Sequence, residues 1–195
     1  PQLLNPIEED ALEMYLSSPE WLLEEKHDGR RLMVEVKSGA VEGSNRKGLV
    51  VSLPREVETA LQGLPDCVLD GELVGTKFWV FDALSWQGEA ITHLPLSERV
   101  TIRQAMTFGD LIYAEAVSAC ATAEEKRATY DALKTAGKEG IVFKRAAAPY
   151  KVGRPSAGGD QVKFKFYATC SAVVAKVNLQ RSVAVSLENT IMGNV

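Results

Sequence analysis

The sequence has few of the residues that mark several common protein classes. Only three cysteines occur, Cys67, Cys120 and Cys170, an odd number without the spacing of metal ligands. So sparse a set excludes a disulfide framework and indicates buried thiols in a reducing compartment. The two histidines belong to no Ser/His/Asp, Cys/His or metal-binding set, and we expect His27 to be exposed and His93 to lie in a loop.

Long apolar segments and targeting segments are also missing. No run is long enough to span a bilayer, and the first residues do not read as a signal peptide. The sequence has no internal repeat and no glycine-rich phosphate loop of the Walker type. We therefore expect a soluble, intracellular (cytoplasmic) protein without a membrane partner.

The composition fits one globular domain with a small appendage. Of the 195 residues, 46% are hydrophobic and 25% are charged, and the formal net charge is −4. This acidic balance hides a basic stretch over residues 138–165, where only Glu139 and Asp160 oppose a series of lysines and arginines. A local basic surface can therefore coexist with an acidic chain.

Residue patterns predict an α+β fold. Helices are expected over residues 5–17, 57–61, 95–106 and 122–137, the last opened by a Thr122/Glu125 capping box. Strands are expected over residues 21–25, 31–37, 39–43, 67–74, 77–84, 111–117, 140–145 and 162–167. Because very short turns join several of them, we expect antiparallel sheets flanked by helices rather than parallel βαβ winding. Residues 171–178 and 182–188 predict a further strand pair that opens a second module.

Lys26 stands in the most informative stretch, Lys-x-Asp-Gly-x-Arg, which Asp28, Gly29 and Arg31 complete. A lysine near acids at a tight turn can be a nucleophile, but only when its amine is neutral. At a reference pKa of ~10.4, about one lysine in 2,500 is neutral at pH 7, and reaching half requires a drop of roughly 3.4 units, about 4.6 kcal/mol. Neighbouring cations could supply this shift.

Acidic and aromatic residues occur on two adjacent predicted strands. Asp70 and Glu72 share one strand face, as carboxylates that hold Mg²⁺ can do, although an acidic strand end explains them equally well. One of the rings in Phe78-Trp79-Val80-Phe81-Asp82 could stack on a base, although a core strand is the simpler interpretation.

Three further groups carry basic or acidic residues. Glu139 and Lys144 bracket a buried strand, and Lys163 and Lys165 share one face of another. Each alone could be an exposed corner or a solvated edge. Arg46 is either a phosphate ligand or an ordinary turn residue.

Taken in order, these motifs resemble those of the covalent nucleotidyltransferases, and most closely the ATP-dependent DNA ligases of minimal viral and bacterial type. The resemblance covers about residues 20–170. It implies a nucleotidyltransferase domain, ATP-grasp-like, over residues 1–168 and the beginning of an OB-fold β-barrel over residues 169–195.

The resemblance also implies roles for individual residues. Lys26 would carry AMP covalently, and Glu72 and Glu139 would bind Mg²⁺ or Mn²⁺. Catalysis would involve Lys26, Asp28, Arg31, Lys163 and Lys165. ATP would contact Glu24, Lys26, Arg31, Arg46, Glu72, Phe81, Glu139, Lys144, Lys163 and Lys165. The implied substrate is nicked duplex DNA, sealed by a monomer in DNA repair, replication or recombination.

The sequence departs from the family in two respects. Only about the first two strands of the OB-fold domain, which carries a last motif, are visible, and the tryptophan often found before Lys163 is missing. An RNA ligase, an RNA capping guanylyltransferase and a non-catalytic nucleic-acid binding module therefore stay as alternatives.

Overall fold

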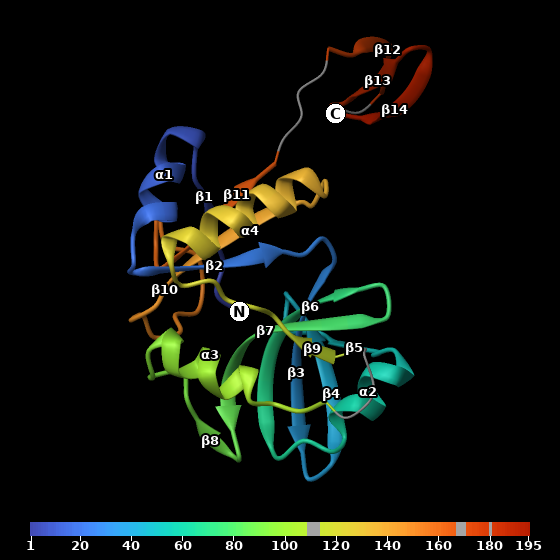
Figure 1. Ribbon diagram of the computed structural model, residues 1–195. Helices are drawn as coiled ribbons and strands as arrows, with labels where there is room; N and C mark the ends of the chain where they lie inside the picture. Colours follow the sequence, from blue (N-terminus) through green and yellow to red (C-terminus); the bar gives the residue numbers. More distant parts are fainter. Residues whose placement is uncertain (109–113, 167–170, 180) are drawn as a thin grey trace.

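The computed structural model describes residues 1–108, 114–166, 171–179 and 181–195. Within them the chain forms two sheets that face each other, with helices on their outer sides, and a separate small sheet near the C-terminus (Figure 1). The α+β class with predominantly antiparallel pairing is therefore confirmed.

The smaller of the two facing sheets has the strand order β1-β11-β10-β2. Its strands are β1 (Asn5–Pro6), β11 (Gln161–Lys165), β10 (Gly140–Arg145) and β2 (Trp21–Lys26). Helices α1 (Glu9–Ser17) and α4 (Ala123–Thr135) cover its outer face (Figure 1). Leu16, Leu23 and Phe143 are among the buried residues of the core between this sheet and the helices.

The larger sheet has seven strands. In the order of the sheet they are β5 (Val50–Val51), β4 (Ala40–Asn45), β3 (Arg30–Lys37), β6 (Cys67–Val74), β7 (Lys77–Trp86) and β8 (Glu89–Ala90), with β9 (Ala114–Ala116) paired to β7. Helix α2 (Arg55–Leu61) buries Val57 and Leu61 in the core of this sheet, and α3 (Leu96–Gln104) packs beside β7. The short connection after β2 leads directly into β3, so this turn joins the two sheets.

Lys126 links α4 to the end of α1 on the outer face of the smaller sheet. Lys126 of α4 is fully buried, and its Nζ donates to the carbonyl oxygens of Tyr15, Ser18 and Trp21 at 3.2, 2.5 and 2.9 Å. These carbonyls lie at the end of α1 and the start of β2, where backbone acceptors lack helical partners. Burial lowers the pKa of Lys126.

Three sequence expectations about the elements need correction. The first helix begins at Glu9 rather than Asn5, because Asn5–Pro6 pair in parallel with β11 and the Asn5 amide donates to the Pro155 and Gly158 carbonyls. His27 was expected to be exposed, yet its side chain is 9% exposed. The C-terminal sheet contains a strand beyond the expected pair, β14 (Thr190–Asn194), next to β13 (Val183–Leu187), which also pairs with β12 (Val173–Val177).

The other expected helices and strands are present in the described residues, apart from small shifts at their ends. Of the thiols expected to be buried, Cys67 is buried and Cys120 is partly exposed. The capping box forms as predicted, with Thr122 accepting from the Glu125 amide and Glu125 accepting in return from the Thr122 amide. The expected strand over residues 111–117 lies partly outside the described residues, which include only Ala114–Ala116 of it as β9. The predicted domain boundary at 168/169 also lies outside them. None of the described helices is long and apolar enough to cross a membrane.

Candidate active site

A cavity lies between the two facing sheets, and most of the predicted nucleotide-binding residues line it. Its volume is about 60 Å³, room for a few water molecules and less than a nucleoside occupies. The lining consists of Leu4, Glu24, Glu25, Lys26, His27, Arg31, Glu72, Phe81, Val142, Lys144 and Gln161. Side chains must therefore move before a nucleotide can enter.

Strand register explains why these side chains meet. Side chains directly opposite each other in neighbouring antiparallel strands point to the same face of the sheet. Three rows cross the inner face of the smaller sheet as a result. They are Lys26–Gly140–Lys165, Glu24–Val142–Lys163 and Leu22–Lys144–Gln161. The facing sheet contributes Arg31 of β3, Glu72 of β6 and Phe81 of β7.

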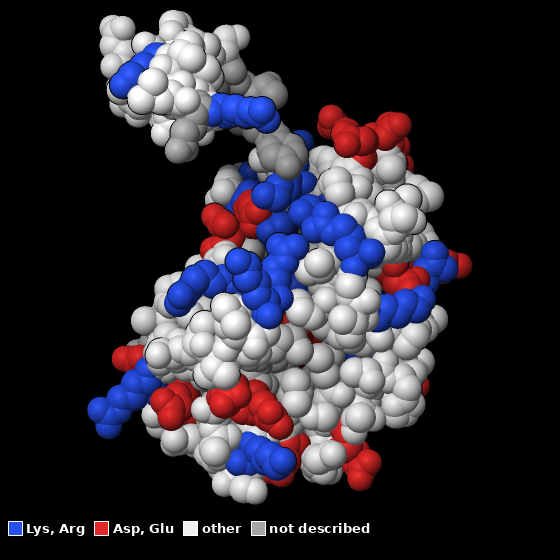
Figure 2. Space-filling view, turned by 180° about the vertical axis from the view of Figure 1, so that it is seen from behind, with Lys and Arg blue, Asp and Glu red and all other residues white. Residues whose placement is uncertain are grey.

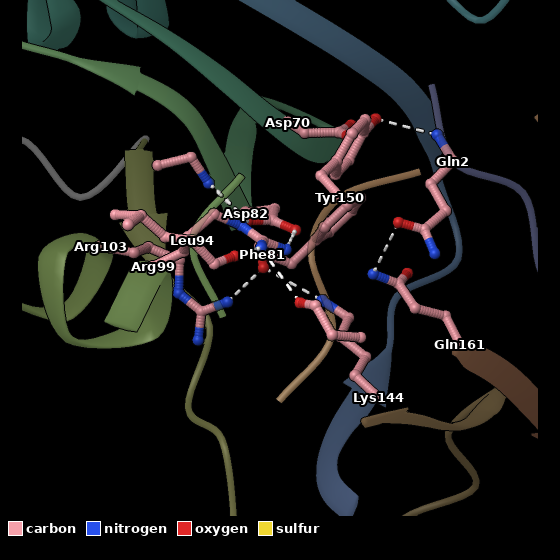
Figure 3. Close-up of polar contacts among 12 residues, drawn as sticks. Gln2, Asp70, Phe81, Asp82, Leu94, Arg99, Arg103, Lys144, Tyr150 and Gln161 are labelled. Carbon is pink, nitrogen blue, oxygen red and sulfur yellow. Dashed lines mark hydrogen bonds and ion pairs between the residues drawn. The ribbon is translucent and has the colours of Figure 1, made fainter. Parts of the chain in front are cut away.

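The inner end of the cavity, which we call the deep end, consists of Glu24, Phe81, Arg103 and Lys144 and is almost closed to solvent. One Glu24 carboxylate oxygen lies 2.5 Å from the Lys144 Nζ, and the other accepts from the Arg103 guanidinium at 2.8 Å. Both cations also donate to the backbone carbonyl of Phe81, and Figure 3 shows them converging on it. Burial lowers the pKa of Lys144, and Glu24 opposes this shift.

Arg31 and Lys144 also cover the aromatic ring of Phe81. The Arg31 guanidinium carbon lies 4.4 Å and the Lys144 Nζ 4.7 Å from the ring centroid, both within the range of a cation–π contact. A base that stacks on Phe81 would have to displace at least one of these cations from the ring.

A hydrogen-bonded network behind the cavity orients Arg31. Its Nε and Nη2 bind the two carboxylate oxygens of Asp70 at 2.5 and 2.6 Å. The Tyr150 hydroxyl donates to Asp70 at 2.9 Å and accepts from the Gln2 amide at 2.8 Å (Figure 3). Asp70 is therefore a partner of Arg31 in this structure, although its place on the strand also suits a metal ligand.

At the opposite end of the cavity, Lys26 and Glu72 are lining residues, and Glu139, Lys163 and Lys165 lie near them without lining the cavity. We call these five residues the mouth. Glu139 lies between two lysines, with one oxygen 2.5 Å from the Lys26 Nζ and the other 2.8 Å from the Lys165 Nζ. Burial alone would raise the pKa of Glu139, but Lys165 and Lys26 together hold it below its usual value. The direct neighbour of Lys26 is thus a carboxylate, and the predicted cations lie around that pair.

Two other groups at the mouth have shifted proton affinities. Burial raises the pKa of Glu72 to about 7, with Glu139 and Asp70 adding to the shift and Arg31 and Lys26 opposing it. Burial also lowers the pKa of Lys163, and the nearby charges of Lys26 and Lys165 lower it further. A dense mixture of acids and bases with altered pKa values is typical of catalytic sites.

The charges at the mouth continue onto a basic surface. Lys163 and Lys165 also line a larger cleft of about 590 Å³, together with Lys134 and Lys138. Figure 2 shows lysine and arginine side chains gathered across one face of the molecule, below the C-terminal module. Such a surface suits a polyanion.

Gly29 and Gly140 lie so close to the backbone of a neighbouring strand that no side chain fits at either position. A Cβ at position 29 would lie 2.3 Å from the Leu73 carbonyl oxygen, and one at position 140 would lie 2.2 Å from that of Phe164. A larger residue at position 29 would push the turn after Lys26 away from β6, and one at position 140 would push β10 away from β11. The glycines of both motifs therefore position the charged residues beside them.

Two predicted site residues lie elsewhere. Asp28 is exposed in the turn after β2. Arg46 is exposed in the turn after β4 and does not line the cavity. Asp82, which follows Phe81, is buried and forms a two-point ion pair with Arg99 of α3.

Sequence reasoning missed Arg103, Tyr150, Gln2 and Gln161. Arg103 looked like an ordinary polar residue of a helix, and Tyr150 lies in a loop rich in glycine, proline and serine. Their roles depend on contacts across 79 and 80 residues of sequence, which no local pattern reveals.

The folded chain matches solved structures of DNA ligases. It aligns over its whole length with a mycobacterial DNA ligase D complexed with ATP and MES, covering 71% of that chain at 22% identity with a TM-score of 0.71. The two facing sheets thus have the fold of the nucleotidyltransferase domain of a DNA ligase, and the C-terminal sheet is consistent with the start of an OB fold.

Sequence comparisons point to the same family. Residues 74–165 match the family model described as the ATP dependent DNA ligase domain. The multifunctional non-homologous end joining DNA repair protein LigD of Mycobacterium tuberculosis is 28% identical over 82% of this chain, and a probable DNA ligase of Pseudarthrobacter chlorophenolicus is 30% identical over 78%. The resemblance to ATP-dependent DNA ligases is thereby confirmed. The chain spans 23% and 35% of the lengths of these two relatives.

Proposed function

We propose that this chain is the catalytic part of an ATP-dependent DNA ligase that seals nicks in duplex DNA, with Lys26 as the nucleophile. The observation that carries this proposal is the grouping of Lys26, Glu72, Glu139, Lys163 and Lys165 beside a cavity that Lys26, Glu72 and Phe81 line. One end of that cavity suits a phosphate chain and the other suits a base.

In the first step the neutral amine of Lys26 attacks the α-phosphorus of ATP. A nitrogen–phosphorus bond forms, the bond to the β-phosphate oxygen breaks, and pyrophosphate leaves with the electron pair. The proton of Lys26 must first pass to water, because Glu139, 2.5 Å away, has a pKa below its usual value and would hold the metal ion. Lys163 and Lys165 offset the negative charge that develops on the phosphate oxygens.

The deep end would bind the adenosine. Once Arg31 moves aside, the Phe81 ring can stack on the adenine. Glu24 already binds Lys144 and Arg103, so we infer that it acts mainly by holding these cations at the edge of the base. Arg31 and Glu72, which face each other across the register of β3 and β6, would contact the ribose and the α-phosphate.

Glu72 and Glu139 would hold the metal ion, Mg²⁺ or Mn²⁺. They fit such an ion because both are partly buried carboxylates whose charges affect each other, and hard cations prefer oxygen ligands. The described residues contain no group of three or more candidate ligands, so a bound ion would keep several of its waters. A divalent ion at this place would supply positive charge next to the triphosphate.

The two remaining steps use DNA. AMP passes from Lys26 to the 5′-phosphate of a nick, and the 3′-hydroxyl then attacks that phosphate and releases AMP. The basic surface in Figure 2 suits the DNA backbone, whose binding weakens as salt is added. Asp28 and Arg46, exposed on turns, can contribute only by touching a bound substrate. We propose that the ligase acts as a monomer inside the cell and that residues 169–195 open its OB-fold domain.

Incubation with ATP and Mg²⁺ tests the first step. We expect intact-mass analysis to detect one added AMP in the wild type and none in the Lys26→Ala variant. Lys138→Ala serves as a matched control, since Lys138 is an exposed lysine paired with Glu25. Adenylation of Lys26→Ala, or no adenylation of the wild type, contradicts the proposal.

A substrate panel separates the alternatives. A DNA ligase seals a nicked DNA duplex with ATP, an RNA ligase prefers RNA ends, and a capping guanylyltransferase takes GTP. A non-catalytic binding module gains no nucleotide at all. We expect sealing of nicked DNA with ATP and none with NAD or GTP.

A further inference from the structure

His27 and Trp79 form a stacked pair of rings beside the proposed nucleophile. The ring centroids lie 4.5 Å apart, and the planes meet at 13°. His27 directly follows Lys26 in the turn that leaves β2, whereas Trp79 lies on β7 of the facing sheet. The pair therefore bridges the two sheets at the mouth of the cavity.

Further contacts fix both rings. The His27 side chain is 9% exposed, and its Nδ1 lies 3.5 Å from a Glu25 carboxylate oxygen. Trp79 pairs with Glu72 across β6 and β7, and the Lys77 ammonium lies 5.3 Å from its ring centroid. An imidazole held in this way has little freedom to rotate.

The turn after Lys26 is three residues long, and at Arg30 the chain enters β3, where Arg30 pairs with Leu73 of β6 in the larger sheet. Gly29 approaches the Leu73 carbonyl closely but carries no side chain, and Asp28 is exposed. The ring of His27 is consequently the side chain through which this turn packs against β7. A shift of the turn would carry the Lys26 amine away from its present position.

We propose that His27 and Trp79 are a positioning pair, which holds the turn of Lys26 against β7 so that its amine is aimed at the α-phosphorus of ATP. This inference rests on the proposed adenylation of Lys26 and assigns no proton transfer to His27. Because the pair orients the nucleophile and does not touch the base, its loss should lower the rate of adenylation and leave the KM for ATP nearly unchanged.

The test compares variants of His27 in a single-turnover adenylation assay. His27→Ala should slow AMP transfer at saturating ATP by up to roughly tenfold, since an aromatic pair of this kind contributes about 0.5–1.5 kcal/mol. His27→Phe, which keeps a flat ring, should restore most of the rate with an unchanged pH profile. His93→Ala, which alters the exposed loop histidine, is the matched control and should behave as the wild type.

Variants of Trp79 complete a double-mutant cycle. Trp79→Leu should slow the reaction about as much as His27→Ala, and the two together should cost little more than either alone. Additive effects, an unchanged rate in His27→Ala, or a loss confined to the KM each overturn the inference. Failure of His27→Phe to restore the rate, together with a changed pH profile, would assign a proton-transfer role instead and also overturns it.

The outcome is separable from that of the proposed function. If the wild type itself gains no AMP on Lys26, the proposed function fails. If the wild type is adenylated and His27→Ala reacts equally fast, only the positioning pair fails. Thermal unfolding of each variant checks that the rate change does not come from loss of the fold.

Discussion

The two ends of the cavity use the same residue types in opposite ways. At the deep end, Glu24 and Lys144 have side chains 1% and 4% exposed, and Arg103 supplies a second cation. At the mouth, Lys26 and Glu139 are 20% and 17% exposed, and Lys165 shares the carboxylate. Each end therefore pairs one glutamate with two cations, but only the mouth remains in contact with water.

This difference in exposure separates charged residues that stabilise the fold from charged residues that can take part in the reaction. A buried ion pair that loses one member leaves an unpaired charge without solvent, so its members are costly to remove. A partly solvated pair loses little, because water takes over the exposed group. The deep end should thus be required for folding, and the mouth should be free to exchange partners during chemistry.

The largest contrast is expected between Arg103→Met and Lys26→Met. Arg103→Met should lower the free energy of unfolding by about 3–5 kcal/mol, because it removes one of the two cations that hold buried Glu24. Lys26→Met should change the free energy of unfolding by less than about 1 kcal/mol, while abolishing AMP transfer. Urea unfolding followed by fluorescence measures the first effect, and intact mass measures the second. Equal destabilisation by both variants would erase the distinction between the two ends.

A smaller effect should come from the turn that carries the nucleophile. Gly29→Ala places a methyl group 2.3 Å from the Leu73 carbonyl oxygen. The strain should lower the free energy of unfolding by about 1–3 kcal/mol and slow adenylation. Gly63→Ala is the matched control, since nothing lies within 4 Å of the Cβ it would add. If both substitutions are equally tolerated, the turn is not fixed by this approach.

Glu72 should make stability depend on pH in an unusual direction. Its pKa is raised from 4.5 to about 7, so the folded protein retains a proton that the unfolded chain has already lost. Stability should therefore fall as the pH rises from about 4.5 to 7, by roughly 1–2 kcal/mol after solvent screening. Glu72→Gln should remove this slope when unfolding is measured with EDTA at several pH values. An identical slope in both proteins would mean that Glu72 does not titrate in this window.

The smallest effect should come from a surface ion pair remote from both ends. Glu13 and Arg127 have side chains 66% and 46% exposed, and their ion pair joins α1 to α4. Glu13→Gln should leave both the unfolding midpoint and the adenylation rate unchanged within error. A clear loss of stability would show that exposure does not separate structural from dispensable charges in this fold.

The sequence motifs named every residue of the mouth and three of the four residues of the deep end, Glu24, Phe81 and Lys144. That these residues act together was implied by the family resemblance and not by any local pattern. Arg103 and Tyr150 come from a helix and a loop, and they reach the site only through the packing of distant elements. No periodicity encodes such contacts.

The same limit explains the errors in the fold. Asn5, Pro6 and the acids after them have the form of a helix start, yet pairing with β11 kept the first two residues extended. His27 looked exposed because it lies between charged residues, and the ring that covers it is 52 positions further along the chain. Tertiary contacts decided both cases.

Lys126 offers an internal reference for chemical footprinting. Its ammonium group is enclosed by three backbone carbonyls, so acylating reagents should modify the exposed lysines of the native protein and spare this one. Label on Lys126 would then report that α1 has separated from α4. The same experiment would show which lysines become protected when nucleotide or DNA binds.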